Sequence, residues 1–118
     1  LILLPPRDWL YARCDQRFVQ MMEKGAIEEV EALLHRDLDP NLPVMRAIGV
    51  PEIAAMLSGQ ISRDAAIEQG QRATRNYAKR QFTWFRNQSP AEWPRLEQEL
   101  DNDLVHKFAI KLREDALT

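Results

Sequence analysis

The sequence predicts a mainly α-helical fold of about five helices, preceded by a short strand remnant. The four glycines and seven prolines among the 118 residues leave long stretches without the residues that disfavour helices most. Within these stretches apolar residues recur every three or four positions, as they do on the buried face of a helix. A chain of this length has room for one small domain with one core, which we expect to span residues 1–118 as a single helical domain.

Composition and spacing exclude several kinds of protein. No apolar run approaches the roughly 18 residues of a membrane span, so we expect no membrane partner. The single cysteine, Cys14, excludes an internal disulfide and fits a reducing cytoplasm. His35 and His106 lie far apart, without metal-ligand spacing around them, and we predict no metal site in this chain.

The first predicted elements are a strand at residues 1–4 and a helix at residues 7–24. The four leading residues are apolar and precede Pro5-Pro6, which indicates the end of a buried strand of an α/β core. Gly25 is the predicted stop of the helix. The apolar residues of this helix at helical spacing are Leu10, Cys14, Phe18, Met21 and Met22.

Two shorter elements are expected before the longest helix. The second helix spans residues 26–36, followed by a loop at 37–43 and a turn at 44–49. Pro51 suits the first position of a helix at residues 51–58. The apolar face of the second helix consists of Ile27, Val30, Leu33 and Leu34.

The longest helix is predicted at residues 63–87, with Ser62 as its N-cap and Ser89-Pro90 at its end. Residues 93–96 are expected to be a short extended piece. A last helix is predicted at residues 97–115. Its expected buried residues are Leu100, Leu104, Phe108 and Leu112.

The long helix carries a row of cations. Five of the chain's 16 basic residues, and none of its 18 acidic ones, lie between Glu68 and Glu92. At about 100° per residue, a single arc of roughly 80° holds Arg72, Arg75, Lys79, Thr83 and Arg86. A row of about 20 Å can contact successive RNA phosphates. The alternative is a solvated face, which usually mixes both signs. The opposite side is expected to pack into a core through Ile67, Thr74, Tyr77, Ala78, Gln81, Trp84 and Phe85.

Arg17 is predicted at the edge of the apolar arc of the first helix, one turn after Arg13. A guanidinium turned toward an apolar face requires an anionic partner. The residues alone leave open whether that partner is a carboxylate or a phosphate. Gly49, which follows Arg46 by three residues, permits a positive φ or a close backbone approach.

Together these stretches resemble one enzyme family. The pattern Arg13-x-x-x-Arg17-Phe18, followed by Gly25 and Glu29-Val30, resembles its first helical pair. Its C-terminal signature is similar, in order and spacing, to Arg46-Ala47-Ile48-Gly49, Gly59-x-Ile61-Ser62 and Arg72-x-Thr74-Arg75-x-Tyr77-Ala78-Lys79-Arg80-Gln81-x-Thr83-Trp84-Phe85-Arg86. The family is tRNA dimethylallyltransferase, also called tRNA isopentenylpyrophosphate transferase. The resemblance covers residues 4–86 and indicates a C-terminal fragment. Val50 departs from the tyrosine of many members, and Cys14 from a usual isoleucine.

The resemblance implies that the full-length enzyme transfers a dimethylallyl group from dimethylallyl diphosphate to N6 of the adenosine 3′ of the tRNA anticodon (A37). It implies Mg²⁺ and a P-loop on the diphosphate, and a carboxylate that takes the N6 proton, all upstream of this chain. No G-x-x-x-x-G-K-[ST] motif occurs here, so we expect the fragment alone to be inactive. We expect the full-length enzyme to be a cytoplasmic monomer.

By the same resemblance, Arg17 is the catalytic candidate, a stabiliser of the diphosphate leaving group. The other candidates are expected to contact the tRNA anticodon stem-loop. They are Arg13, Arg46, Ala47, Ile48, Gly49, Val50, Pro51, Arg72, Arg75, Lys79, Arg80, Gln81, Phe82, Thr83, Trp84, Phe85 and Arg86. Two functions from other classes stay open, a free-standing helical RNA-binding module and a helical protein-interaction domain.

Overall fold

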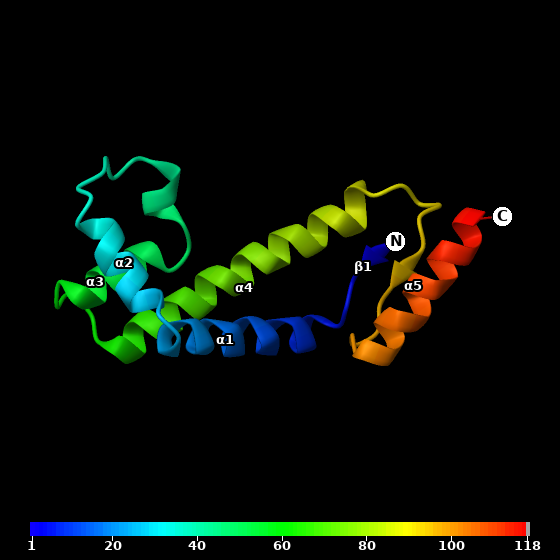
Figure 1. Ribbon diagram of the computed structural model, residues 1–118, viewed down its shortest axis with the longest axis horizontal. Coiled ribbons are helices and arrows are strands. Elements are labelled where there is room, and N and C mark those ends of the chain that lie inside the picture. Colours follow the sequence, from blue (N-terminus) through cyan, green and yellow to red (C-terminus); the bar gives the residue numbers. More distant parts are fainter. Residues whose placement is uncertain (118) are drawn as a thin grey trace.

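Two long helices form the body of the molecule, and shorter elements gather at its two ends (Figure 1). The structure, a computed structural model, describes residues 1–117. In chain order its elements are β1 (Ile2–Leu3), α1 (Arg7–Glu23), α2 (Ala26–Leu34), the 3-10 helix η1 (Pro43–Arg46), α3 (Val50–Leu57), α4 (Arg63–Gln88), β2 (Arg95–Leu96) and α5 (Asn102–Leu117). The prediction of a mainly helical fold with five α-helices and a short strand is confirmed for this part of the chain.

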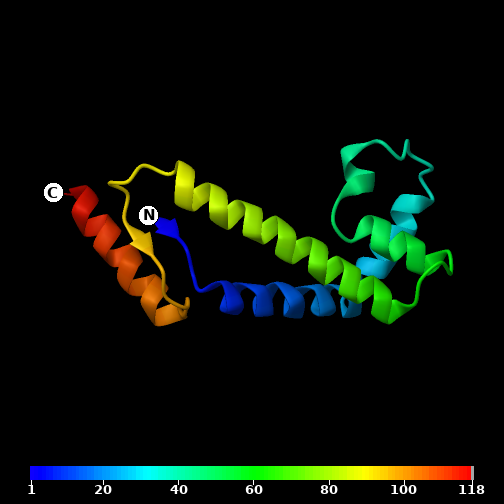
Figure 2. The same cartoon turned by 180° about the vertical axis from the view of Figure 1, so that it is seen from behind.

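Helices α1 and α4 run antiparallel and cross near the C-terminal end of α1, and both views show them diverging toward the opposite end (Figures 1 and 2). Helices α2 and α3 and the 3-10 helix η1 cluster around the crossing. The two strands and α5 lie at the far end. The molecule is therefore elongated, with principal extents of 57 × 26 × 23 Å.

The core lies where α1, α2, α3 and α4 meet. It consists of Phe18, Met22, Val30 and Ile53, and all four come from the apolar faces that helical spacing gives these helices. Phe18 lies at its centre. A Cβ atom placed on Gly70 of α4 would lie 2.0 Å from Cζ of Phe18, so the ring occupies space that only a glycine leaves open.

The face of α4 that packs inward differs from the predicted one. Only Ala66 and Gly70 of this helix are buried. Tyr77 is 50% exposed, Trp84 59% and Phe85 42%, so the prediction that these aromatics pack into a core is wrong, as it is for exposed Gln81. The reason is that α1 and α3 cover the first half of α4, while α1 diverges from the second half (Figure 2). The other members of the predicted face, Ile67, Thr74 and Ala78, are half-buried.

Most predicted helix ends lie within two residues of the observed ones. At the start of α4, the Ser62 hydroxyl accepts a hydrogen bond from Ala65 N–H at 3.1 Å, so the predicted N-cap is confirmed. The start of the last helix at residue 97 is wrong. Asp101 accepts a hydrogen bond from Leu104 N–H at 2.7 Å, which begins α5 at Asn102 because such a carboxylate satisfies a free N–H of the first turn.

Helix α5 also packs less than predicted, since none of its residues is buried. Leu104 and Phe108 are half-buried, Leu112 is exposed, and Leu100 is half-buried in the loop before the helix. The expectation that these four residues form a buried face is therefore wrong for the described part of the chain.

The strand at the N-terminus pairs with the extended piece predicted at residues 93–96. Strands β1 and β2 are parallel, with Ile2 opposite Arg95 and Leu3 opposite Leu96. The Arg95 guanidinium also donates hydrogen bonds to the carbonyl oxygens of Ser89 at 3.2 Å and Trp93 at 3.0 Å. This arginine ties the end of α4 to the sheet, because a cation satisfies carbonyl groups that a helix end leaves free.

Candidate nucleic-acid interface

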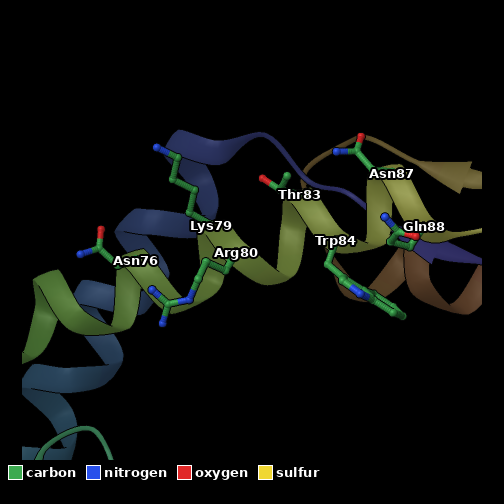
Figure 3. Close-up of a pocket in the computed structure, with 7 residues that line it drawn as sticks. All are labelled: Asn76, Lys79, Arg80, Thr83, Trp84, Asn87 and Gln88. Carbon is green, nitrogen blue, oxygen red and sulfur yellow. The ribbon is translucent and has the colours of Figure 1, made fainter.

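The second half of α4 borders a hollow whose lining residues all belong to this helix (Figure 3). Figure 3 shows Arg80 and Trp84 projecting to one side of the helix, and Lys79, Thr83 and Asn87 to the other. The hollow is lined by Asn76, Lys79, Arg80, Thr83, Trp84, Asn87 and Gln88. One surface thus combines cations, amides and an indole ring.

Two of the five predicted cations are paired with carboxylates. Arg75 Nη1 lies 2.6 Å from Asp15 Oδ1 of α1, and Arg72 Nη2 lies 3.6 Å from Glu68 Oε1. The prediction of an uninterrupted row of free cations is therefore wrong at these positions. The sequence could not show the first pair, because its two residues lie 60 positions apart.

The other three of these five cations form no salt bridge with any residue that the structure describes; they are Lys79, Arg80 and Arg86. The Arg80 guanidinium lies 5.7 Å from the ring centroid of Tyr77. The Arg86 guanidinium lies 5.9 Å from that of Phe82. Cation–π contacts of this kind leave the positive charge available to a phosphate, because the ring carries no net charge.

An exposed aromatic pair borders these cations. The rings of Trp84 and Phe85 meet edge to face, with centroids 5.3 Å apart and planes at 86°. Trp84 keeps more than half of its surface exposed. An exposed indole beside cations can stack an unpaired base while the cations contact its phosphates. Helical periodicity assigned this tryptophan to the core, whereas the family resemblance included it among the expected tRNA contacts.

Arg17 lines hollows beside Met21 and Leu10, in agreement with its predicted place at the edge of the apolar arc, but it is exposed and not buried against that face. It contributes to a hollow with Gln20, Lys24 and Glu29 and to a second one with Arg13. The Arg13 guanidinium lies 4.8 Å from the ring centroid of Trp9. Arg17 forms no salt bridge within residues 1–117, so its guanidinium can bind an anion from solvent.

Cys14 lies between these arginines and the α1–α4 interface, and it is half-buried. Burial raises the pKa of its thiol, and the neighbouring Asp15 carboxylate raises it further, against the lowering effect of Arg17 and Arg75. The thiol therefore stays protonated at neutral pH and is a poor nucleophile. It takes no part in the chemistry proposed below.

The segment at residues 46–51 lies at the opposite end of the molecule from the C-terminal end of α4. Gly49 is buried at φ +100°, and the Cβ position that it leaves open lies 3.7 Å from Cε2 of Phe18. Its N–H donates a hydrogen bond to Glu52 Oε2 at 2.8 Å. Of the other predicted residues here, Arg46, Ala47, Ile48 and Pro51 are exposed, and Val50 is half-buried.

Apart from Arg72 and Arg75, which are paired with carboxylates, the predicted site residues fall into three groups. Arg13 and Arg17 lie on α1, residues 46–51 lie near the core, and Lys79 to Arg86 lie along the second half of α4 (Figure 1). In that last group Gln81, Trp84, Phe85 and Arg86 are exposed, and Phe82 and Thr83 are half-buried. The hollow also includes Asn76, Asn87 and Gln88, which were not among the residues predicted from the sequence.

No three histidine, cysteine, aspartate or glutamate side chains within residues 1–117 come close enough together to hold a metal ion. The described residues thus do not fit a Mg²⁺ site. The same part of the chain contains no helix that is both long enough and apolar enough to cross a membrane.

Comparison with known proteins decides the family. The family model described as IPP transferase matches residues 1–88. The chain belongs to the IPP transferase family. The match includes α1, α4 and the whole candidate interface.

Curated relatives of this chain are named tRNA dimethylallyltransferase. The one from Sphingopyxis alaskensis is 65% identical over 118 residues, which are 100% of this chain and 39% of that protein. The one from Novosphingobium aromaticivorans is 70% identical over 113 residues, which are 96% of this chain and 40% of that protein. The chain thus spans about two fifths of the length of these relatives.

Solved structures of family members share its fold. The tRNA isopentenylpyrophosphate transferase of Bacillus halodurans matches with a TM-score of 0.75 at 37% identity, over 97% of this chain and 39% of that one. The enzyme of Staphylococcus epidermidis, with delta(2)-isopentenylpyrophosphate transferase in its title, matches with a TM-score of 0.78 at 29% identity, over 98% and 38%.

Proposed function

We propose that this chain is the RNA-contacting helical part of a tRNA dimethylallyltransferase. In the proposed reaction, a dimethylallyl group moves from dimethylallyl diphosphate to N6 of the adenosine 3′ of the anticodon, in the cytoplasm. The observation that carries the proposal is the exposed surface around Lys79, Arg80 and Trp84, inside the segment that matches the IPP transferase family. The relatives' name supports the reaction class.

The surface on α4 suits an anticodon stem-loop because it offers both kinds of contact that such an RNA needs. Lys79 and Arg80 can neutralise phosphates. Trp84 offers a stacking platform for an unpaired loop base, and Asn87 carries an amide that can donate and accept hydrogen bonds at a base edge. Lys79 and Arg80 are free of carboxylate partners within residues 1–117.

Arg17 is the proposed stabiliser of the leaving group. As N6 forms its bond to C1 of the dimethylallyl group, the bond from C1 to the diphosphate oxygen breaks, and negative charge builds up on the diphosphate. The N6 proton passes to a base. A guanidinium can bind two diphosphate oxygens at once, and a cation that meets the developing charge lowers the barrier. We assign no step to Mg²⁺, because the described residues offer it no site.

The test separates these two roles in the full-length enzyme. We expect Arg17→Ala to lower kcat by about 100-fold and to leave the KM for tRNA nearly unchanged. Lys79→Glu is expected to raise the KM for tRNA and to keep most of kcat. Arg36→Glu is the matched control, since this exposed cation lies outside both surfaces, and it should change neither constant.

Two outcomes would overturn the proposal. If each variant changed kcat and KM equally, the separation of roles would be wrong. If the purified 118-residue chain modified tRNA without any added protein, the placement of the diphosphate and base chemistry outside this chain would be wrong.

A further inference from the structure

Helices α1 and α4 meet through a series of contacts that change in character along the interface. Where they cross, the Phe18 ring packs onto Gly70. One turn further along, Arg75 Nη1 lies 2.6 Å from Asp15 Oδ1. Beyond that point the Arg7 guanidinium lies 5.0 Å from the ring centroid of Phe82. The contacts thus pass from apolar to ionic to cation–π as the helices diverge (Figure 2).

The ionic contact holds Asp15 from two successive turns of α4. Besides the Arg75 guanidinium on its carboxylate, Gln71 Nε2 donates a hydrogen bond to the backbone oxygen of Asp15 at 3.2 Å. Both charged side chains are about two thirds buried, with 32% and 35% of their surface exposed. Solvent therefore screens this pair less than it screens the open Glu68–Arg72 pair, whose side chains are 71% and 68% exposed.

Within residues 1–117, no fully buried side chain lies in this half of the α1–α4 interface. Within α1 the buried residues are Phe18 and Met22, and within α4 they are Ala66 and Gly70. All four lie at the crossing of α1 and α4, or on the opposite side of it from the ends that diverge. Of the polar contacts that join α1 and α4 beyond the crossing, the ion pair is the shortest.

We propose that Asp15 and Arg75 are positioning residues, which set the separation between Arg17 on α1 and the Lys79–Arg80 surface on α4. This inference rests on the function proposed above. Arg17 follows Asp15 by two residues, and Lys79 follows Arg75 by one helical turn. Arg75 thus orients the RNA-binding helix, in place of the direct RNA contact that the sequence predicts for it.

Such positioning affects catalysis because the two substrates must meet within a narrow range. Bond formation requires the reacting atoms to approach to about 3–3.5 Å, and a misplacement of about 1 Å can cost roughly 100-fold in rate. A change of the angle between α1 and α4 moves the RNA relative to the diphosphate. It leaves the contacts between RNA and α4 intact.

The test uses the full-length enzyme with Asp15→Asn, which removes one charge at nearly constant size, and Arg75→Gln, which removes the charge and shortens the side chain. We expect kcat to fall by about 10- to 100-fold in both variants. The KM for tRNA and the salt dependence of tRNA binding should stay within about twofold of wild type, because no phosphate contact is lost. The exchanged pair, Asp15→Arg with Arg75→Asp, should recover part of kcat.

A direct RNA contact by Arg75 gives a different pattern and would overturn the inference. Arg75→Gln would then raise the KM for tRNA and lower the slope of log affinity against log salt by about one. Asp15→Asn would not do so, and the exchanged pair would recover nothing. Arg36→Gln is the matched control, with an expected change in kcat of less than about twofold because this exposed cation lies outside both surfaces.

A merely structural role is excluded by dividing kcat by the folded fraction, measured by circular dichroism. If kcat per folded molecule stayed at the wild-type value, the inference would be wrong.

The variant Arg75→Lys is used if the other variants do not fold. It keeps the positive charge and loses the guanidinium, so we expect a kcat between those of wild type and Arg75→Gln. A wild-type enzyme without transferase activity would instead contradict the proposed function, so the two failures are distinguishable.

Discussion

The two halves of α4 share one continuous helix and differ in almost every other respect. In the first half, Ala66 and Gly70 are buried against neighbouring helices. In the second half, no residue is buried, and Trp84 and Phe85 present their rings to solvent. The first half therefore fixes the helix in the fold, and the second half holds side chains out to a partner. A single helix can serve both purposes because its rigidity extends the position set at one end to the other.

The contrast also shows that apolar content does not locate the core of this helix. The buried half relies on small residues, alanine and glycine, which allow close approach, whereas the exposed half carries the large aromatic ones. Burial depends on which surface the neighbouring helices cover, and α1 covers α4 chiefly around Phe18. Variants in the two halves of α4 and in the core residue that it contacts test this contrast.

The largest effect is expected for Phe18→Ala, which empties the centre of the core. Truncation of a buried phenylalanine typically costs about 3–5 kcal/mol, and Phe18 is only 3% exposed. Urea unfolding followed by circular dichroism measures the free energy of unfolding. Trp84→Ala is the control from the exposed half, with an expected change within about 0.5 kcal/mol. Equal losses from both variants would remove the distinction between the halves.

Gly70→Ala should destabilise the chain by about 1–3 kcal/mol, because the new methyl group would overlap the Phe18 ring. In a helix an alanine in place of glycine normally stabilises by nearly 1 kcal/mol, so the sign of the change is diagnostic. Combining it with Phe18→Leu, which removes ring atoms from the contact, should recover part of the loss. A more stable Gly70→Ala protein would show that the helices do not approach this closely.

Trp84→Ala should weaken binding of an anticodon stem-loop by about 1–3 kcal/mol, the usual value of a base stacked on an aromatic ring. Fluorescence anisotropy of a labelled RNA measures the dissociation constant. Trp84→Phe keeps an aromatic surface and should retain most of the affinity. If Trp84→Ala bound as tightly as wild type, the ring would not take part in the interface.

Ser62→Ala is expected to have the smallest effect, about 1 kcal/mol of unfolding free energy, because it removes the hydrogen bond from Ala65 N–H. The change lies in the anchored half of α4, so it should lower stability and leave RNA affinity nearly unchanged. Ser62→Asp restores an acceptor at the cap and should restore the stability. A loss of RNA affinity with full stability would place this end of the helix in the interface as well.

Local structure was predictable from the sequence, because its signals lie within a few residues of their effects. Ser62 and Gly25 correctly predicted where helices begin and end, and the period of Phe18 and Met22 predicted the inner face of α1. The start of α5 was not found, because Asp101 competes with several nearby residues as an N-cap and only its hydrogen bond decides.

Contacts between distant segments were not predictable from one sequence. The ion pair between Asp15 and Arg75, the approach of Phe18 to Gly70 and the pairing of β1 with β2 each join residues more than 50 positions apart. The resemblance of the motifs to a known family supplied the candidate residues. It did not show which of them face outward, because that depends on how α1 and α4 cross.

The salt dependence of RNA binding tests most directly whether the second half of α4 contacts RNA. Affinity for an anticodon stem-loop is measured for the wild-type chain and for Lys79→Ala over a range of salt concentrations. If Lys79 contacts a phosphate, the variant should lose about 0.7–0.9 from the slope of log affinity against log salt. An unchanged slope, with or without a loss of affinity, would contradict a contact between Lys79 and an RNA phosphate.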